Sequence, residues 1–129
     1  MIEDIKKVLL VDDDQNIRFV AQMTLEGLTE WKIVVADSGK AAIEVAPNEK
    51  PDLIMLDVMM PEMDGPTTFM KLQEIPSLRN VPVIFMTAKI QTHELENYLK
   101  LGAAGVVSKP FDPMTLPDEI AKILNTVKR

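Results

Sequence analysis

The sequence contains no cysteine, which excludes disulfide bonds, zinc–thiolate sites and thiol catalysis. Histidine occurs once, as His93, so a histidine metal cluster is excluded too, and we expect His93 to be an exposed helical residue. No apolar run approaches the roughly 20 residues that a membrane-spanning helix needs. The apolar run after the charged N-terminus is too short for a signal peptide. We therefore expect a cytoplasmic protein without membrane association.

Basic residues are also in short supply. The chain has 14 lysines and arginines against 20 aspartates and glutamates, which gives a net charge of −6. A domain this acidic repels nucleic acid, so we expect no direct nucleic-acid binding. The length of 129 residues suits one domain, and no linker or low-complexity tract divides the chain. We predict a single domain over residues 1–129.

Short apolar runs recur at even spacing along the chain. They are residues 8–11, 33–36, 53–56 and 83–86, with a weaker run at 103–107. They do not alternate with polar residues, which is typical of strands covered on both faces, as in a parallel sheet. Helical patterns lie between and after them, so strand and helix alternate five times. This alternation predicts an α/β fold, a doubly wound parallel sheet with helices on both faces.

Local signals predict several helix ends. Asp14 is well placed to cap the first helix, and Gly102 to end the fourth. The segments 38–46 and 65–75 are shorter helical patterns. Near the C-terminus, Pro117 lies too deep for a helix that begins at residue 113. We therefore predict a turn over residues 112–115 and a regular helix from residue 116.

Polar residues follow the apolar runs. In open α/β sheets, ligands bind beyond the carboxyl ends of the strands. The first run is followed by Asp12–Asp14, the third by Asp57, the fourth by Thr87 and the fifth by Ser108 and Lys109. The second run ends in Asp37 and Ser38, on what should be an outer strand. We predict that the carboxylates of Asp12, Asp13 and Asp57, the Thr87 hydroxyl and the Lys109 ammonium meet at one edge of the sheet.

This set of side chains is suited to phosphoryl chemistry. Carboxylates so close together raise one another's pKa values unless a cation joins them, and oxygen ligands suit Mg²⁺. Mg²⁺ and Lys109 together would balance the charge of three carboxylates. Asp57 stands alone after a buried strand and can act as a nucleophile that forms an aspartyl-phosphate. The metal and Lys109 would stabilise charge on the phosphoryl oxygens, and Thr87 could donate a hydrogen bond to one of them.

The chain resembles the response-regulator receiver domain, the CheY-like family of two-component signalling. The motifs that carry the resemblance are Leu10-Val11-Asp12-Asp13-Asp14, Asp57-Val58-Met59-Met60-Pro61-Glu62-Met63-Asp64-Gly65, Met86-Thr87-Ala88 and Lys109-Pro110-Phe111. The resemblance implies a flavodoxin-like (βα)5 fold with strand order 2-1-3-4-5. It also implies that Asp57 accepts a phosphoryl group from a sensor histidine kinase or a histidine phosphotransfer protein, in a phosphorelay.

The resemblance assigns further roles. It implies that Asp13, Asp57 and the backbone carbonyl of Met59 bind Mg²⁺ directly, with Asp12 acting through water. Thr87 and Lys109 would contact the phosphoryl oxygens, and the Lys109–Pro110 bond would be cis. Such a domain helps its own phosphorylation and dephosphorylation but has no separate substrate, so it is not an enzyme in the usual sense. Its phosphorylation switches binding to a downstream protein or an output domain.

One position departs from the family pattern. Receivers commonly carry an aromatic residue three positions before the lysine, where this chain has Val106. In the family that ring rotates inward when the threonine moves. Without it, we expect the change to be reported mainly by the loop after Thr87, near Lys89 and Ile90.

Three alternatives stay open at this point. The chain could be the N-terminal receiver of a longer regulator with an output domain, for example one that binds DNA. It could be a phosphatase of the haloacid-dehalogenase kind, with Asp12 as nucleophile and Asp14 as acid and base. It could also be a receiver that signals without phosphate. Because the full set of chemical residues is present, we favour the phosphorylated receiver.

Overall fold

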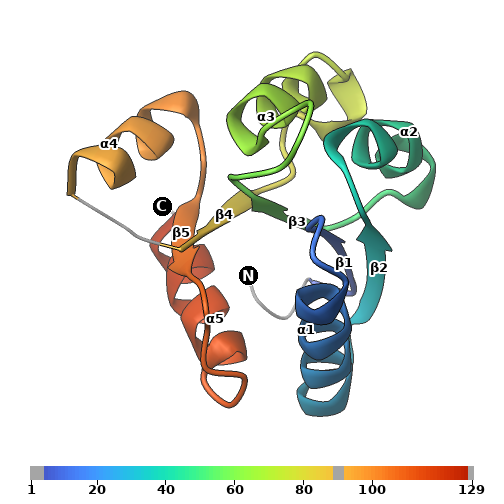
Figure 1. The fold of residues 1–129 in the computed structure, drawn as a ribbon, viewed down its shortest axis with the longest axis vertical. Helices are drawn as coiled ribbons and strands as arrows, with labels where there is room; N and C mark the ends of the chain where they lie inside the picture. The colour runs from blue at the N-terminus through green and yellow to red at the C-terminus, as the bar shows by residue number, and fades with distance from the viewer. Residues whose placement is uncertain (1–4, 89–91, 128–129) are drawn as a thin grey trace.

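The computed structural model describes residues 5–88 and 92–127. Its five strands form one parallel sheet in the order β2-β1-β3-β4-β5 (Figure 1). The strands are β1 (Lys7–Val11), β2 (Lys32–Ala36), β3 (Leu53–Asp57), β4 (Val83–Thr87) and β5 (Gly105–Ser108). The helices are α1 (Gln15–Leu28), α2 (Gly39–Glu49), α3 (Gly65–Gln73), α4 (Thr92–Leu101) and α5 (Leu116–Val127), with a 3₁₀ turn at Pro76–Leu78. The predicted α/β class and strand order are confirmed.

Helices cover both faces of the sheet, as Figure 1 shows: α1 and α5 on one face, and α2, α3 and α4 on the other. Each face has its own hydrophobic core. On the first face, the core contains Ala21 and Leu25 of α1 and Leu116 and Ile120 of α5, together with side chains of the strands. The second joins α2 and α3 to the opposite side chains of the same strands. Every residue of β3 and β4 is buried, as continuous apolar runs predict.

The edge strand β2 differs from the central strands. Lys32 and Val35 are exposed, while Ile33 and Ala36 are buried. Among the described residues, β2 lies at the edge of the sheet and pairs with β1 alone. The central strands β3 and β4 are therefore buried on both faces, whereas the edge strand β2 is partly exposed.

The predicted helix ends are mostly confirmed. The Asp14 side chain caps α1 by accepting hydrogen bonds from the backbone N–H groups of Asn16 and Ile17, at 2.8 and 3.2 Å. α4 ends at Leu101, directly before Gly102, whose φ of +117° favours glycine. Before α5, the Leu116 N–H donates to the Asp112 carbonyl at 3.0 Å, which closes the predicted turn.

Helix α2 is longer than the sequence indicates. We predicted 38–46, but the helix continues through Pro47 to Glu49 and ends at Lys50, which adopts a left-handed φ of +52°. No glycine marks this end, but Pro51 directly follows Lys50 and cannot continue a helix. No helix in the described part of the chain is long and apolar enough to cross a membrane.

The strand order gives the sheet a topological switch point between β1 and β3. From β1 the chain moves outward to β2, whereas from β3 it moves the other way, to β4 and β5. The connections after β1 and β3 therefore diverge, and in open α/β sheets ligands bind at such a switch point. The carboxyl edge of the sheet carries the polar residues that the sequence singles out.

Candidate functional site

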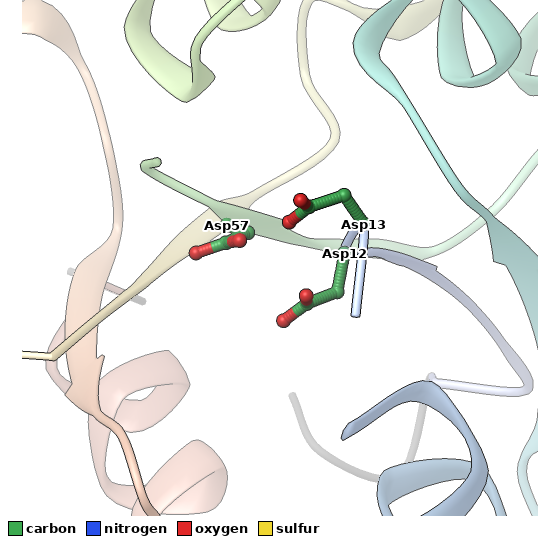
Figure 2. Close-up of side chains that lie close together, drawn as sticks. All are labelled: Asp12, Asp13 and Asp57. Atoms are coloured by element: carbon green, nitrogen blue, oxygen red, sulfur yellow. The ribbon is translucent and has the colours of Figure 1, made fainter. Parts of the chain in front are cut away.

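Three carboxylates meet where the neighbouring strands β1 and β3 end (Figure 2). Asp12 and Asp13 directly follow β1, and Asp57 is the last residue of β3. One oxygen from each carboxylate lies within 4.8 Å of the others. Asp12 and Asp57 are 0% and 2% exposed, whereas Asp13 is exposed. The cluster is thus buried on the strand side and open to solvent on the side of Asp13.

Lys109 bridges two of these carboxylates. Its Nζ lies 3.0 Å from Asp12 Oδ2 and 3.0 Å from Asp57 Oδ1. The lysine follows β5, and its backbone N–H donates to the Thr87 carbonyl at 2.8 Å. The Lys109–Pro110 bond is cis, as the resemblance implies. Residues from the first, third and fifth strands therefore converge as predicted.

The pKa values show how these groups act on one another. Burial raises the pKa of Asp57 from 3.8 to about 6, the hydrogen bond from Lys109 opposes this rise, and the charge of Asp12 adds to it. Burial alone would lower the pKa of Lys109, but its hydrogen bonds to Asp57 and Asp12 outweigh burial and raise it. With all three carboxylates ionised, one ammonium does not neutralise them, and the excess of negative charge is one that a divalent cation would offset.

Asp12 is held by contacts on every side. Its N–H donates to the Ala36 carbonyl at 3.1 Å, and its Oδ1 accepts from the Asp14 N–H at 2.9 Å. Its own carbonyl accepts a hydrogen bond from Arg18 Nη1 at 2.8 Å. This last contact is not predictable from the sequence, because no motif marks Arg18 and the bond forms only when the side chain folds back along α1.

The loop between β3 and α3 is held close to Asp57. The Gly65 N–H donates to the Val58 carbonyl at 2.8 Å. A Cβ at Gly65 would lie only 2.4 Å from the Asp57 carbonyl oxygen and 2.8 Å from Val58 Cα, so only glycine fits there. Met59 lies within this loop, with 75% of its surface exposed. The metal contact of its carbonyl stays a prediction.

Thr87 ends β4, and 8% of its surface is exposed. It pairs in register with Ser108, directly before Lys109. This places Thr87 at the carboxyl edge of the sheet, as predicted. Its hydrogen bond to a phosphoryl group stays a prediction.

Other candidate residues lie elsewhere. Asp37 is exposed beyond the edge strand and is not in the acidic cluster, and Ser38 caps α2 by accepting from the Ala41 N–H at 3.1 Å. His93 is exposed on α4, as predicted. Lys89 and Ile90, which we expect to report the switch, lie outside the described residues.

Val106, which occupies the usual aromatic position, is half-buried on β5 and pairs in register with Phe85. The Phe85 ring in turn contacts Tyr98 of α4, with ring centroids 5.0 Å apart. The second core thus reaches from β4 to α4 beside Val106.

Comparisons with known proteins agree with this geometry. The profile of the family described as response regulator receiver domain matches residues 8–121. The alkaline phosphatase synthesis transcriptional regulatory protein PhoP of Bacillus subtilis is 35% identical over 119 residues, which are 92% of this chain and 48% of that protein. The response regulator SaeR of Staphylococcus aureus is 37% identical over 124 residues, 95% of this chain and 52% of that protein. The chain spans about half the length of these curated relatives.

Solved structures show the same likeness. The chemotaxis protein CheY4 of Vibrio cholerae superimposes with a TM-score of 0.86 at 28% identity, covering 92% of this chain and 98% of that one. A putative response regulator from Chloroflexus aurantiacus superimposes with a TM-score of 0.83 at 26% identity, covering 95% and 99%. The similarity therefore extends over nearly the whole of these shorter proteins.

Proposed function

This chain belongs to the response regulator receiver domain family, and from that membership we propose that Asp57 accepts a phosphoryl group from a phosphohistidine. The domain is a two-component signalling domain rather than a classical enzyme. Its acidic pocket of Asp12, Asp13 and Asp57 is typical of a phosphoacceptor site. The proposed donor is a sensor histidine kinase or a histidine phosphotransfer protein.

The position of Asp57 carries the proposal. It is a buried carboxylate at a strand end, with Oδ1 held by Lys109 at 3.0 Å. In the proposed step, an Asp57 carboxylate oxygen attacks the phosphorus of the donor. The phosphorus–nitrogen bond breaks, its electron pair returns to the imidazole, and Asp57 becomes an acyl phosphate. Lys109 and the Thr87 hydroxyl then bind phosphoryl oxygens, and hydrolysis of the acyl phosphate resets the domain.

The acidic cluster fits Mg²⁺ by the chemistry of its donors. Its ligand atoms are carboxylate oxygens from Asp12, Asp13 and Asp57, and one side is open for the water molecules that Mg²⁺ retains. We propose that Asp13, Asp57 and the Met59 carbonyl bind the ion directly and that Asp12 acts through water. When bound, Mg²⁺ would stabilise negative charge on the phosphoryl oxygens.

The proposed output is a change in binding to a downstream protein or an output domain. Relatives of about twice the length include proteins named as transcriptional regulators, which supports an output domain as one such partner. We propose that residues 1–129 fold as one receiver domain, whether or not it is the N-terminal part of a longer regulator. The cytoplasm, where kinases obtain ATP, is the proposed compartment.

A small phosphodonor tests the chemistry. Acetyl phosphate with Mg²⁺ should add one phosphoryl group to the wild-type chain, as measured by mass spectrometry, and Asp57→Asn should abolish this addition. Asp37→Asn is the matched control, because Asp37 is an exposed aspartate outside the cluster. Peptide mapping that placed the phosphoryl group on Asp12 would favour the phosphatase alternative instead. A wild-type chain that took up no phosphoryl group would support signalling without phosphate.

A further inference from the structure

Arg18 is not one of the three carboxylate residues of the acidic pocket, but its side chain contacts the backbone of one of them, Asp12. It lies near the start of α1, where its backbone N–H donates to the Asp14 carbonyl at 3.0 Å. Its half-buried side chain folds back past the end of the helix, and Nη1 donates to the Asp12 carbonyl at 2.8 Å. An arginine on the first helix thus holds the backbone at the end of the first strand.

The carbonyl that Arg18 holds belongs to the peptide between Asp12 and Asp13. The orientation of that peptide determines where the Asp13 side chain starts and therefore where its carboxylate points. The Asp12 N–H and Oδ1 are held by Ala36 and by the cap residue Asp14. The bond from Arg18 adds the constraint on the carbonyl side, and it comes from a charged donor, which makes it stronger than a neutral one.

The guanidinium binds a carbonyl and not a carboxylate. Within the described part of the chain, Arg18 forms no ion pair, so it does not compete with a metal for the oxygens of Asp12, Asp13 or Asp57. Its positive charge nevertheless lies close to the acidic cluster and would repel a cation. Arg18 therefore has two opposed effects on a metal: its hydrogen bond orients the ligands, and its charge weakens binding.

We propose that Arg18 is a positioning residue that fixes the Asp12–Asp13 peptide in the orientation the divalent cation requires. This inference rests on the proposed function, because it assigns Arg18 to the same metal-dependent site. In this proposal, the effect of orienting the metal ligands outweighs the repulsion between the guanidinium and the cation. Removal of the guanidinium should therefore weaken Mg²⁺ binding, although it also removes a nearby positive charge. If the role of Arg18 were purely electrostatic, removal of the guanidinium would strengthen Mg²⁺ binding. If its role were purely structural, removal would change the stability of the fold but not the Mg²⁺ affinity.

The test is Mg²⁺ titration of the full chain by calorimetry. Arg18→Met keeps the apolar stem but loses both charge and donor, and its Mg²⁺ affinity should fall by about tenfold or more, as residues that orient metal ligands typically show. Arg18→Lys keeps the charge and one donor and should lie between Arg18→Met and wild type. The matched control is Arg79→Met. Arg79 also donates a side-chain hydrogen bond to a backbone carbonyl, that of Gln73 at 3.1 Å, but it is exposed and lies after α3.

Two further measurements separate positioning from folding. In metal-free protein, amide hydrogen exchange at Asp14 should be faster in Arg18→Met than in wild type, because the turn is less constrained. In phosphorylation assays, the Mg²⁺ concentration for half-maximal rate should rise, while the rate at saturating Mg²⁺ is largely recovered.

Unchanged or tighter Mg²⁺ binding in Arg18→Met would overturn the inference. If that variant does not fold, wild-type affinity in Arg18→Lys would overturn it equally. The proposed function can fail independently of this inference: a wild-type chain that binds Mg²⁺ but takes up no phosphoryl group rejects phosphoacceptance, whereas the order of Mg²⁺ affinities still decides the role of Arg18.

Discussion

Asp57 combines burial with like-charged neighbours, and its pKa of about 6 makes its ionisation sensitive to pH near neutrality. Only the ionised carboxylate is nucleophilic. With limiting Mg²⁺, phosphorylation of Asp57 should therefore fall by about tenfold between pH 7 and pH 5, in step with the ionised fraction. Saturating Mg²⁺ should shift this midpoint to lower pH, because the cation favours the ionised form. Initial rates with acetyl phosphate, measured across this pH range, provide the check.

Lys109 lowers the pKa of Asp57, so its removal should shift the titration upward. In metal-free Lys109→Met, the carboxyl carbon of Asp57 should titrate by NMR with a midpoint above that of wild type. Lys32→Met is the control. Lys32 is exposed and begins β2, the outer strand on the other side of the sheet from β5. A midpoint near 3.8 in the wild-type protein would contradict the effect of burial.

At the scale of secondary-structure elements, the junction of β3 and α3 depends on a single residue, Gly65. The Cβ of Gly65→Ala would lie 2.4 Å from a backbone oxygen of Asp57, so the strand end or the helix must move. We expect the free energy of unfolding to fall by about 1–3 kcal/mol, the usual cost of overpacking, and Asp57 phosphorylation to slow as well. Urea unfolding and initial phosphorylation rates measure the two effects.

The control for Gly65→Ala is Gly27→Ala, on α1. A Cβ at Gly27 meets nothing within 4 Å, so alanine should stabilise this helix by about 0.5–1 kcal/mol. The same chemical change thus has opposite signs at the two positions. Equal effects would show that the contact between Gly65 and Asp57 does not limit the packing there.

At the end of α2, introducing a glycine is expected to stabilise the protein. Lys50 ends the helix with a left-handed φ of +52°, a conformation that costs side-chain-bearing residues about 1–2 kcal/mol. Lys50→Gly should therefore raise the free energy of unfolding by about 0.5–1 kcal/mol. Lys40→Gly, within the first turn of the same helix, should lower it by a similar amount. Thermal unfolding of both variants gives the comparison, and destabilisation by Lys50→Gly would contradict the argument.

The helix ends also show what sequence can predict at this scale. The cap at Asp14 and the turn from Asp112 to Leu116 were predictable, because short-range hydrogen bonds and proline geometry determine them. The end of α2 was predicted too early, at residue 46: Pro51 marks the true end, whereas Lys50 adopts a left-handed conformation that its residue type does not favour. The Arg18 contact was not predictable. It depends on how a long side chain folds along α1, which residue spacing does not specify.

Across the whole molecule, the site joins segments far apart in the chain, and a bound ion should therefore stabilise the fold as a whole. A ligand that binds only the folded state adds about 2.7 kcal/mol at a concentration of 100 times its dissociation constant. Saturating Mg²⁺ should thus raise the free energy of unfolding of the wild type by roughly this amount. Asp13→Ala should lose most of the gain, and Asp37→Ala should retain it. Full retention in Asp13→Ala would reject Asp13 as a ligand.

At this scale most of the architecture was predictable from the sequence. Continuous apolar runs identified the strands, and the motif resemblance supplied their order. The convergence of Asp12, Asp57 and Lys109 followed because the carboxyl ends of parallel strands share an edge. The sequence did not indicate how exposure divides the cluster, with Asp13 open and Asp12 fully buried, because this depends on the path of the turn into α1.

The bridge from Lys109 to Asp12 spans 97 positions of the chain, which has a consequence for synthesis on the ribosome. Asp12, Asp13 and Asp57 leave the ribosome long before Lys109. A growing chain can therefore bring β1 and β3 together while the Lys109 ammonium is still missing. Only after β5 has docked does the pocket gain its bridging cation. Under the proposed function, a chain still in synthesis lacks the ammonium that would bind a phosphoryl oxygen, so it should accept a phosphoryl group poorly until β5 has docked.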